Sequence, residues 1–156
     1  MKLNKILIAI DDSMESEQAA ERGFDLAHHY HAEVVLVNIK PLIISSPGDA
    51  GSITSMPFEP GLANDPELVK IQSEVSDNII NRTIEKYAGD LVVSHFSEYG
   101  STAESIVEYS NQFNVDLIVI GTHHRSGLDR ILSGSIAEHV IRHSSVAELV
   151  VPFESV

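Results

Sequence analysis

The sequence contains no cysteine and no long apolar run. Without cysteine the chain can form neither a disulfide nor a thiolate metal site, which suits a reducing cytoplasm. The apolar run that follows Lys2 and Lys5 covers only residues 6–10, whereas a membrane helix needs about 18 residues. No small-residue cleavage pattern follows it, which argues against a secretory signal. We therefore expect a soluble, cytoplasmic protein that does not bind membranes.

Positive charge is also scarce. The 156 residues include 10 Lys and Arg against 23 Asp and Glu, so the formal net charge is −13. This charge would repel nucleic acid, which we do not expect as a partner. However, Arg125, Arg130 and Arg142, with four histidines, lie within residues 121–143. This cluster is either a local site for a small anion or a chance group on a solvated face.

Short apolar runs predict the strands of a sheet. They are rich in β-branched residues and continuous rather than alternating, which is typical of strands buried on both faces of a parallel sheet. The predicted strands are Lys5–Asp11, Glu33–Ile39, Leu91–Phe96, Val115–Ile120 and Ala147–Val151.

Amphipathic patterns between these runs predict helices. The predicted helices are Ser13–Tyr30, Pro66–Ala88, Ser101–Phe113 and Gly134–His143. Asp12 or Ser13 would cap the first helix, and Ser101 with Glu104 would form a capping box for the third. The alternation of strands and helices predicts an α/β domain with right-handed crossovers.

Residues 40–65 fit no helix or strand. This stretch holds four of the six prolines and three of the nine glycines. A loop of this length is uncommon and is usually functional or mobile. We expect a single domain, residues 1–156, with a long mobile loop at 40–65.

The ends of the predicted strands indicate where a ligand would bind. Open parallel sheets bind ligands at the carboxyl ends of strands, where the winding reverses. If the strand order is 3-2-1-4-5, the reversal lies between the strands that end at Asp11 and Gly121. Asp11 could accept a hydrogen bond from an amine or a ribose hydroxyl, although it is also an ordinary turn residue. Gly121 could adopt a positive φ and let a ligand approach the backbone.

The helix start at Gly134-Ser135 favours an anion. Free N–H groups and the positive end of the helix dipole attract phosphate, and the Ser135 hydroxyl adds a donor. Arg125 and Arg130 could neutralise the charge of the phosphate. A Gly-Ser pair is also common as a plain helix cap. It indicates an anion site only because it is expected to lie beside Asp11 and Gly121.

Several segments resemble the universal stress protein family. They are ILIAIDDS at residues 6–13, YGSTAESIVEYS at 99–110 and AELVVP at 147–152. The family signature G-x2-G-x9-G-(S/T) lies on Gly121–Ser135. The resemblance covers nearly the whole chain except residues 40–65.

The resemblance implies an open five-stranded parallel sheet, order 3-2-1-4-5, with helices on both faces, as in adenine nucleotide alpha hydrolase-like proteins. It also implies an ATP site, with Mg²⁺ accompanying the nucleotide, between strands one and four. By position, Asp11 would face adenine or ribose and the Ile39 backbone would meet adenine. The other implied contacts are Ala9, Ile120, Gly121, His124, Arg125, Gly134, Ser135, Ile136 and Ala137.

One signature position differs from the family. The second glycine is His124 here. Its ring either occupies space that phosphate would need or donates a hydrogen bond to phosphate. Two functions therefore stay open: an ATP-binding regulatory dimer of the stress response, or a dimeric scaffold that binds no nucleotide. In both, the resemblance implies a homodimer through the last strand, Ala147–Val151.

Catalytic and metal sites have weaker support. An adenylyl transferase of the wider nucleotide-binding group would need an H-x-G-H motif near the first strand, where this chain has DDSMESE at residues 11–17. We therefore predict no enzymatic activity, although slow ATP hydrolysis stays open. His139 and His143 have the i, i+4 spacing of metal ligands but lack an evident third ligand.

Overall fold

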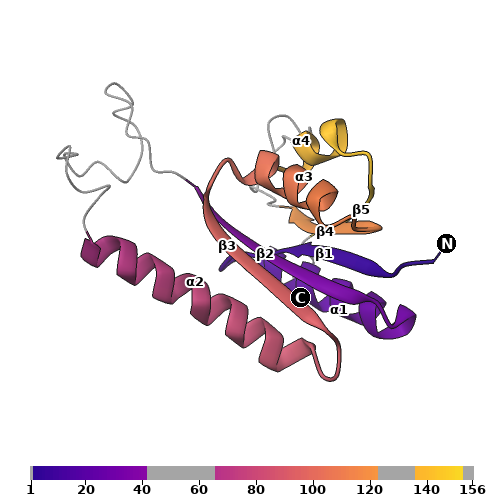
Figure 1. The fold of residues 1–156 in the computed structure, drawn as a ribbon, viewed down its shortest axis with the longest axis horizontal. Helices are drawn as coiled ribbons and strands as arrows, with labels where there is room; N and C mark the ends of the chain where they lie inside the picture. The colour runs from indigo at the N-terminus through magenta and orange to yellow at the C-terminus, as the bar shows by residue number, and fades with distance from the viewer. Residues whose placement is uncertain (1, 42–65, 123–135, 153–156) are drawn as a thin grey trace.

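The computed structural model describes residues 2–41, 66–122 and 136–152. Within them, strands and helices alternate along the chain (Figure 1). The strands are β1 (Lys5–Ala9), β2 (Glu33–Pro41), β3 (Val93–Gly100), β4 (Leu117–Thr122) and β5 (Ala147–Pro152). The helices are α1 (Met14–Tyr30), α2 (Pro66–Tyr87), α3 (Thr102–Gln112) and α4 (Ile136–His143).

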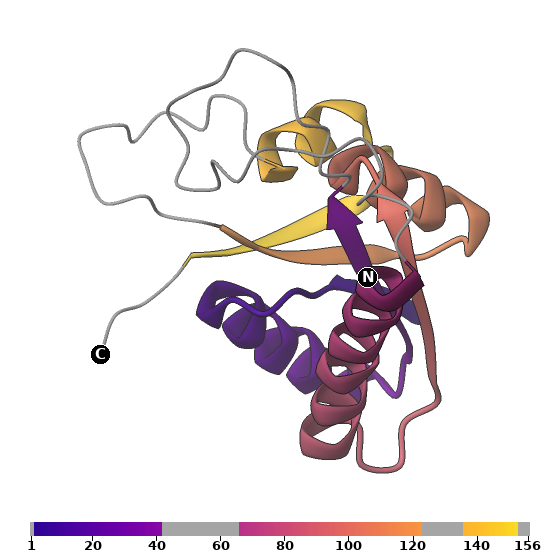
Figure 2. The ribbon, with the colours of Figure 1, turned by 90° about the vertical axis from the view of Figure 1, so that its left-hand side faces the viewer.

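The strands form one sheet in the order β3-β2-β1-β4-β5, and all neighbouring strands are parallel. The predicted α/β class and strand order are confirmed. Helices α1 and α2 cover one face of the sheet, and α3 and α4 cover the other (Figures 1 and 2). This double cover explains why the central strands are apolar at successive positions: Ile6, Leu7 and Ile8 are all fully buried.

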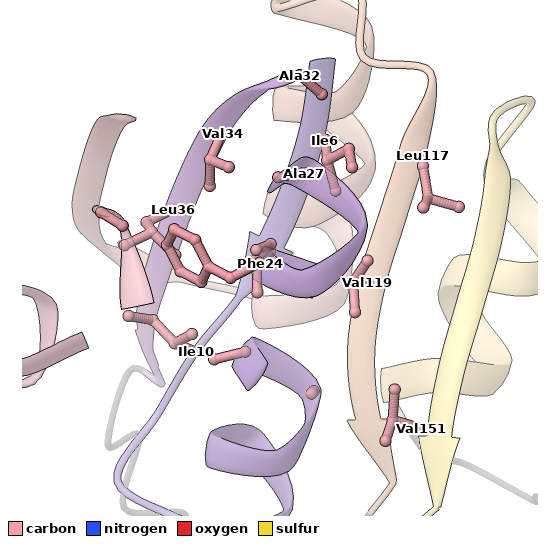
Figure 3. Packing of buried hydrophobic residues seen from close by; sticks show 14 of the residues in the cluster. Ile6, Ile10, Phe24, Ala27, Ala32, Val34, Leu36, Leu117, Val119 and Val151 are labelled. Carbon is pink, nitrogen blue, oxygen red and sulfur yellow. The ribbon is translucent and has the colours of Figure 1, made fainter. Parts of the chain in front are cut away.

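Side chains of the two sheet faces form two cores. On the first face, Ile6, Leu36 and Val119 pack with Phe24 of α1 (Figure 3). Ile80 of α2 belongs to the same core. On the second face, β-strand residues of opposite parity pack against α3 and α4. The fully buried members of this core are Leu7, Val37, Ile106, Ile118 and Val140. Each such side chain contributes about 1.5–3 kcal/mol on burial, so the sheet is fixed from both sides.

Helix α1 is closed at both ends by local hydrogen bonds. The Ser13 hydroxyl accepts a hydrogen bond from the Ser16 N–H at 3.1 Å, which satisfies a free donor of the first turn. His31 ends the helix in the left-handed conformation, with φ 53°. The predicted start at Ser13 is thus confirmed as a cap. No helix in the described part of the chain has the length and apolar character that crossing a bilayer requires.

Two local predictions were wrong. Lys40 and Pro41 belong to β2, because they pair with Tyr99 and Gly100 of β3, so they are not part of a loop; residues 42–65 of that predicted loop lie outside the described residues. The Ser101 side chain makes no capping hydrogen bond. Its backbone is nevertheless extended, with ψ 107°, as is that of the capping Ser13, with ψ 157°.

Candidate functional site

A pocket of about 410 Å³ lies at the carboxyl ends of β1, β2 and β4. This is the point where the winding of the sheet reverses, since β1 pairs with β2 on one side and with β4 on the other. The connections that follow β1 and β4 therefore leave in opposite directions and open a crevice between them. The pocket is also bordered by the start of α1, by α3 and by the start of α4.

Seven of the eleven site residues predicted from the sequence line this one pocket. They come from the ends of β1, β2 and β4 and from the start of α4: Ala9, Asp11, Ile39, Ile120, Gly121, Ile136 and Ala137. The other four, His124, Arg125, Gly134 and Ser135, lie outside the described residues, as does Arg130. Every predicted site residue that the structure describes is thus brought to the same cavity.

Three apolar residues of the pocket, Ile10, Val37 and Ile106, were missed by the sequence-based prediction. Val37 and Ile106 are 1% exposed and line the pocket with Ile39 and Ile120. Val37 stands two residues before Ile39 and so shares its face of β2, a signal that could have found it. Ile106 comes from α3, and only the packing of that helix on β2 brings it to the pocket. Together these side chains give the pocket an apolar wall.

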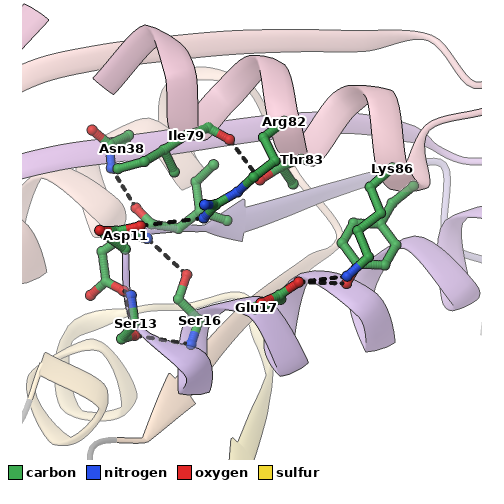
Figure 4. A network of polar contacts seen from close by, with 12 residues as sticks. Asp11, Ser13, Ser16, Glu17, Asn38, Ile79, Arg82, Thr83 and Lys86 are labelled. Carbon is green, nitrogen blue, oxygen red and sulfur yellow. Dashed lines mark hydrogen bonds and ion pairs between the residues drawn. The ribbon is translucent and has the colours of Figure 1, made fainter. Parts of the chain in front are cut away.

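Asp11 lies at the border of the pocket with its carboxylate oriented by neighbours. Its Oδ1 accepts hydrogen bonds from the Ser13 N–H at 2.8 Å and from the Ser13 hydroxyl. Its own N–H donates to Ser16 Oγ at 2.7 Å (Figure 4). A carboxylate has about four acceptor positions, so these bonds leave capacity for a ligand donor.

Gly121 lies in the pocket for a reason other than the predicted one. Its φ is not in the left-handed region; among the described glycines only Gly89 has a positive φ. A Cβ at Gly121 would instead lie 2.6 Å from the carbonyl oxygen of Glu15 and 2.8 Å from its carbonyl carbon. The glycine therefore allows the first turn of α1 to pack directly on β4. The predicted positive φ was wrong, and Gly121 lines the pocket together with Asp11.

The start of α4 faces the pocket. Ile136 is the first residue of this helix, and Ala137, 3% exposed, lines the pocket beside it. The first N–H groups of a helix lack partners within the helix and carry the positive end of its dipole. The pocket thus combines an apolar wall, an oriented carboxylate and a helix end suited to an anion.

The histidine pair of α4 is engaged with its own helix. The rings of His139 and His143 stack with centroids 4.1 Å apart, and His143 Nδ1 lies 2.8 Å from the carbonyl oxygen of His139. Among the residues that the structure describes, no three His, Asp or Glu side chains are grouped so that they could hold a metal ion.

Comparisons of the sequence and of the fold with known proteins agree on one family. A statistical model of the Universal stress protein family matches residues 2–152. Universal stress protein MJ0531 of Methanocaldococcus jannaschii is 31% identical over 147 residues, which cover 94% of this chain and 81% of that protein. Universal stress protein UspA from Lactobacillus plantarum has the same fold, with a TM-score of 0.74 at 20% identity over 97% of this chain and 99% of its own.

Two further solved structures of the same fold hold adenine nucleotides. One is a universal stress protein in complex with cAMP, with a TM-score of 0.63 at 22% identity over 97% of this chain and 98% of that one. The other is the universal stress protein from Archaeoglobus fulgidus in complex with dAMP, with a TM-score of 0.64 at 15% identity over 97% and 99% of the two chains.

Proposed function

Since the chain belongs to the universal stress protein family, we propose that it is an ATP-binding regulatory protein of the stress response. The nucleotide would lie between the ends of β1 and β4. The observation that carries this proposal is the convergence of Asp11, Ile39, Gly121 and Ala137 on one pocket of about 410 Å³. Small-molecule sites typically enclose about 300–1,000 Å³.

The chemistry of the pocket suits an adenine nucleotide. Adenine has flat apolar faces, which match the wall formed by Ile39, Ile120 and Ala9. The Asp11 carboxylate would accept a hydrogen bond from the adenine amine or a ribose hydroxyl. The amino end of α4, at Ile136, would receive phosphate. The signature residues His124, Arg125, Gly134 and Ser135 would complete the phosphate contacts.

Mg²⁺ would enter with the nucleotide. No group of three acidic or histidine side chains suited to a metal occurs in the described segments. Magnesium usually binds through one or two carboxylates together with substrate phosphates and water. Here the phosphates and water would supply most of its ligands. The proposed role is binding, and no catalytic base is assigned.

The proposed assembly is a homodimer through β5. This strand is an edge of the sheet, and its residues Leu149 and Val150 are partly exposed. Partly exposed apolar edges favour pairing with another chain. Pro152 has no N–H and would end such pairing.

Binding can be tested by calorimetry and thermal melting with Mg-ATP. A ligand present at about 100 times its Kd stabilises a protein by about 2.7 kcal/mol. Asp11→Asn removes the charge of the proposed acceptor, and we expect about tenfold weaker binding. Asp12→Asn is the matched control, because Asp12 pairs with Arg82 at 3.3 Å and does not line the pocket. We expect this control to bind ATP as the unaltered protein does.

Two results would contradict the proposal. No stabilisation by millimolar ATP, ADP or AMP would favour the scaffold function. Equal changes of affinity in Asp11→Asn and Asp12→Asn would show that no specific contact from Asp11 holds the ligand.

A further inference from the structure

The peptide that joins Ile10 to Asp11 is held by a side chain on each edge. The Ile10 carbonyl accepts a hydrogen bond from Asn38 Nδ2 at 2.8 Å, and the Asp11 N–H donates to Ser16 Oγ at 2.7 Å (Figure 4). Backbone pairing of β1 with β2 ends here, with the Ile10 N–H bonded to the Val37 carbonyl. Side chains thus continue the hydrogen bonding at the point where the ladder stops.

Asn38 is a polar residue in an apolar environment. It is 4% exposed, and the preceding residues on its face of β2, Val34 and Leu36, belong to the core. A buried amide without partners would destabilise the fold. Asn38 avoids this because its Oδ1 accepts a hydrogen bond from the Ser76 hydroxyl of α2. An apolar side chain at this position would take a hydrogen-bond partner away from both the Ile10 carbonyl and the Ser76 hydroxyl, so the asparagine links these two groups.

The same contacts connect helix α2 to the pocket. Ser76 Oγ lies 2.6 Å from Ser97 Oγ of β3, so Asn38 is held by a chain of polar groups. Six residues further along α2, Arg82 contacts the Asp12 carboxylate at 3.3 Å. Helix α2 therefore contacts Asp12 directly and Ile10 through Asn38, and it does not itself line the pocket of about 410 Å³.

We propose that Asn38 is a positioning residue for the nucleotide site. By holding the Ile10 carbonyl, it fixes the peptide plane that leads into Asp11 and so sets the direction of the Asp11 carboxylate. Ser76 holds Asn38 in turn and makes α2 an element that tunes nucleotide affinity. This inference rests on the proposed function, because it concerns the same pocket.

The variant Asn38→Asp tests the inference with little change in shape. It replaces the donor that faces the Ile10 carbonyl with an oxygen, so the hydrogen bond is lost. Adenosine is the principal probe, because it carries no charge and does not respond to an added negative charge as ATP would. We expect about tenfold weaker binding of adenosine. Asn78→Asp, an exposed position on the same helix as Ser76, is the matched control and should bind normally.

A double-mutant cycle separates positioning from a general structural effect. If Asn38 acts through Asp11, Asn38→Asp should weaken binding little further in a protein that already carries Asp11→Asn. Equal fold losses in the two backgrounds would overturn the inference. Hydrogen exchange of the Asp11 amide in the free protein should also be faster in Asn38→Asp, and an unchanged rate would contradict the proposed restraint.

A second variant covers the case in which Asn38→Asp does not fold. Ser76→Ala removes the donor to Asn38 Oδ1 and leaves the amide in place, so we expect about threefold weaker binding that again disappears in the Asp11→Asn background. The two proposals can fail separately. If the unaltered protein binds no adenosine or adenine nucleotide, the proposed function fails, and the positioning role fails with it. If it binds and the Asn38 and Ser76 variants bind equally well, only the positioning role fails.

Discussion

At the scale of single residues, the carboxylate of Asp116 joins the amino ends of the two central strands, β1 and β4. Asp116, just before β4, accepts hydrogen bonds from the N–H groups of Asn4 at 2.6 Å and Lys5 at 3.1 Å. These residues lie at the start of β1, so one side chain joins the amino ends of two neighbouring strands. The hydrogen bond from the Asn4 N–H, more than any other contact, lowers the pKa of Asp116 below its usual range.

This lowered pKa predicts a dependence of stability on pH. The ionised carboxylate stabilises the folded chain at pH values above its unfolded pKa, about 3.9, and this contribution is lost as pH falls through the lower folded pKa. Asp116→Asn should reduce the free energy of unfolding by about 1–2 kcal/mol at pH 7. Urea denaturation should show this difference shrinking below about pH 4.

The exposed Asp77 offers a matched control for this measurement. Asp77→Asn makes the same chemical change on α2, away from the strand ends, and should alter stability little at either pH. A difference between Asp116→Asn and the unaltered protein that stayed constant from pH 7 to pH 3 would argue against the role of the ionised carboxylate.

At the scale of secondary-structure elements, the contact between α1 and β4 depends on one missing side chain. A Cβ at Gly121 would lie 2.6 Å from the Glu15 carbonyl oxygen, and backbone cannot move aside as a flexible side chain can. We expect Gly121→Ala to destabilise the fold by about 1–3 kcal/mol. Gly100→Ala is the control, because its new methyl group would meet only Ser105 Oγ, at 3.2 Å. This variant should lose less stability than Gly121→Ala. Chemical denaturation measures the free energy of unfolding of both variants. Equal losses of stability would contradict the close contact between Gly121 and the Glu15 backbone.

The sequence predicted every helix and strand of the described residues, because each has its own periodicity and several have start signals such as Ser13. It predicted their ends less well. The extension of β2 to Pro41 depends on pairing with Gly100, which is distant in the sequence. The need for glycine at position 121 likewise gave no signal in the sequence, because the Glu15 backbone comes close to it only in the folded chain. Asn38 gave no local signal, since its role follows from contacts with Ile10 and Ser76.

At the scale of the whole molecule, the two sheet edges are β3 and β5. If β5 pairs with a second copy, Val150→Lys should weaken the dimer, because it places a charge on the pairing edge. Sedimentation velocity should then show more of the 17.1 kDa monomer. Val92→Lys is the matched control: Val92 is 65% exposed and directly precedes β3 at the opposite edge. A monomeric unaltered protein, or equal effects of both variants, would contradict pairing through β5.

The position of β1 in the middle of the sheet affects how the chain folds during synthesis. Strand β1 pairs with β4, whose first residue, Leu117, is synthesised more than a hundred residues after β1. Until then, one side of the apolar segment Ile6–Ile8 has no hydrogen-bonding neighbour from its own chain. An open apolar edge is where nascent chains aggregate. A polypeptide stalled or truncated before Leu117 would therefore leave this side of β1 open to association with other chains.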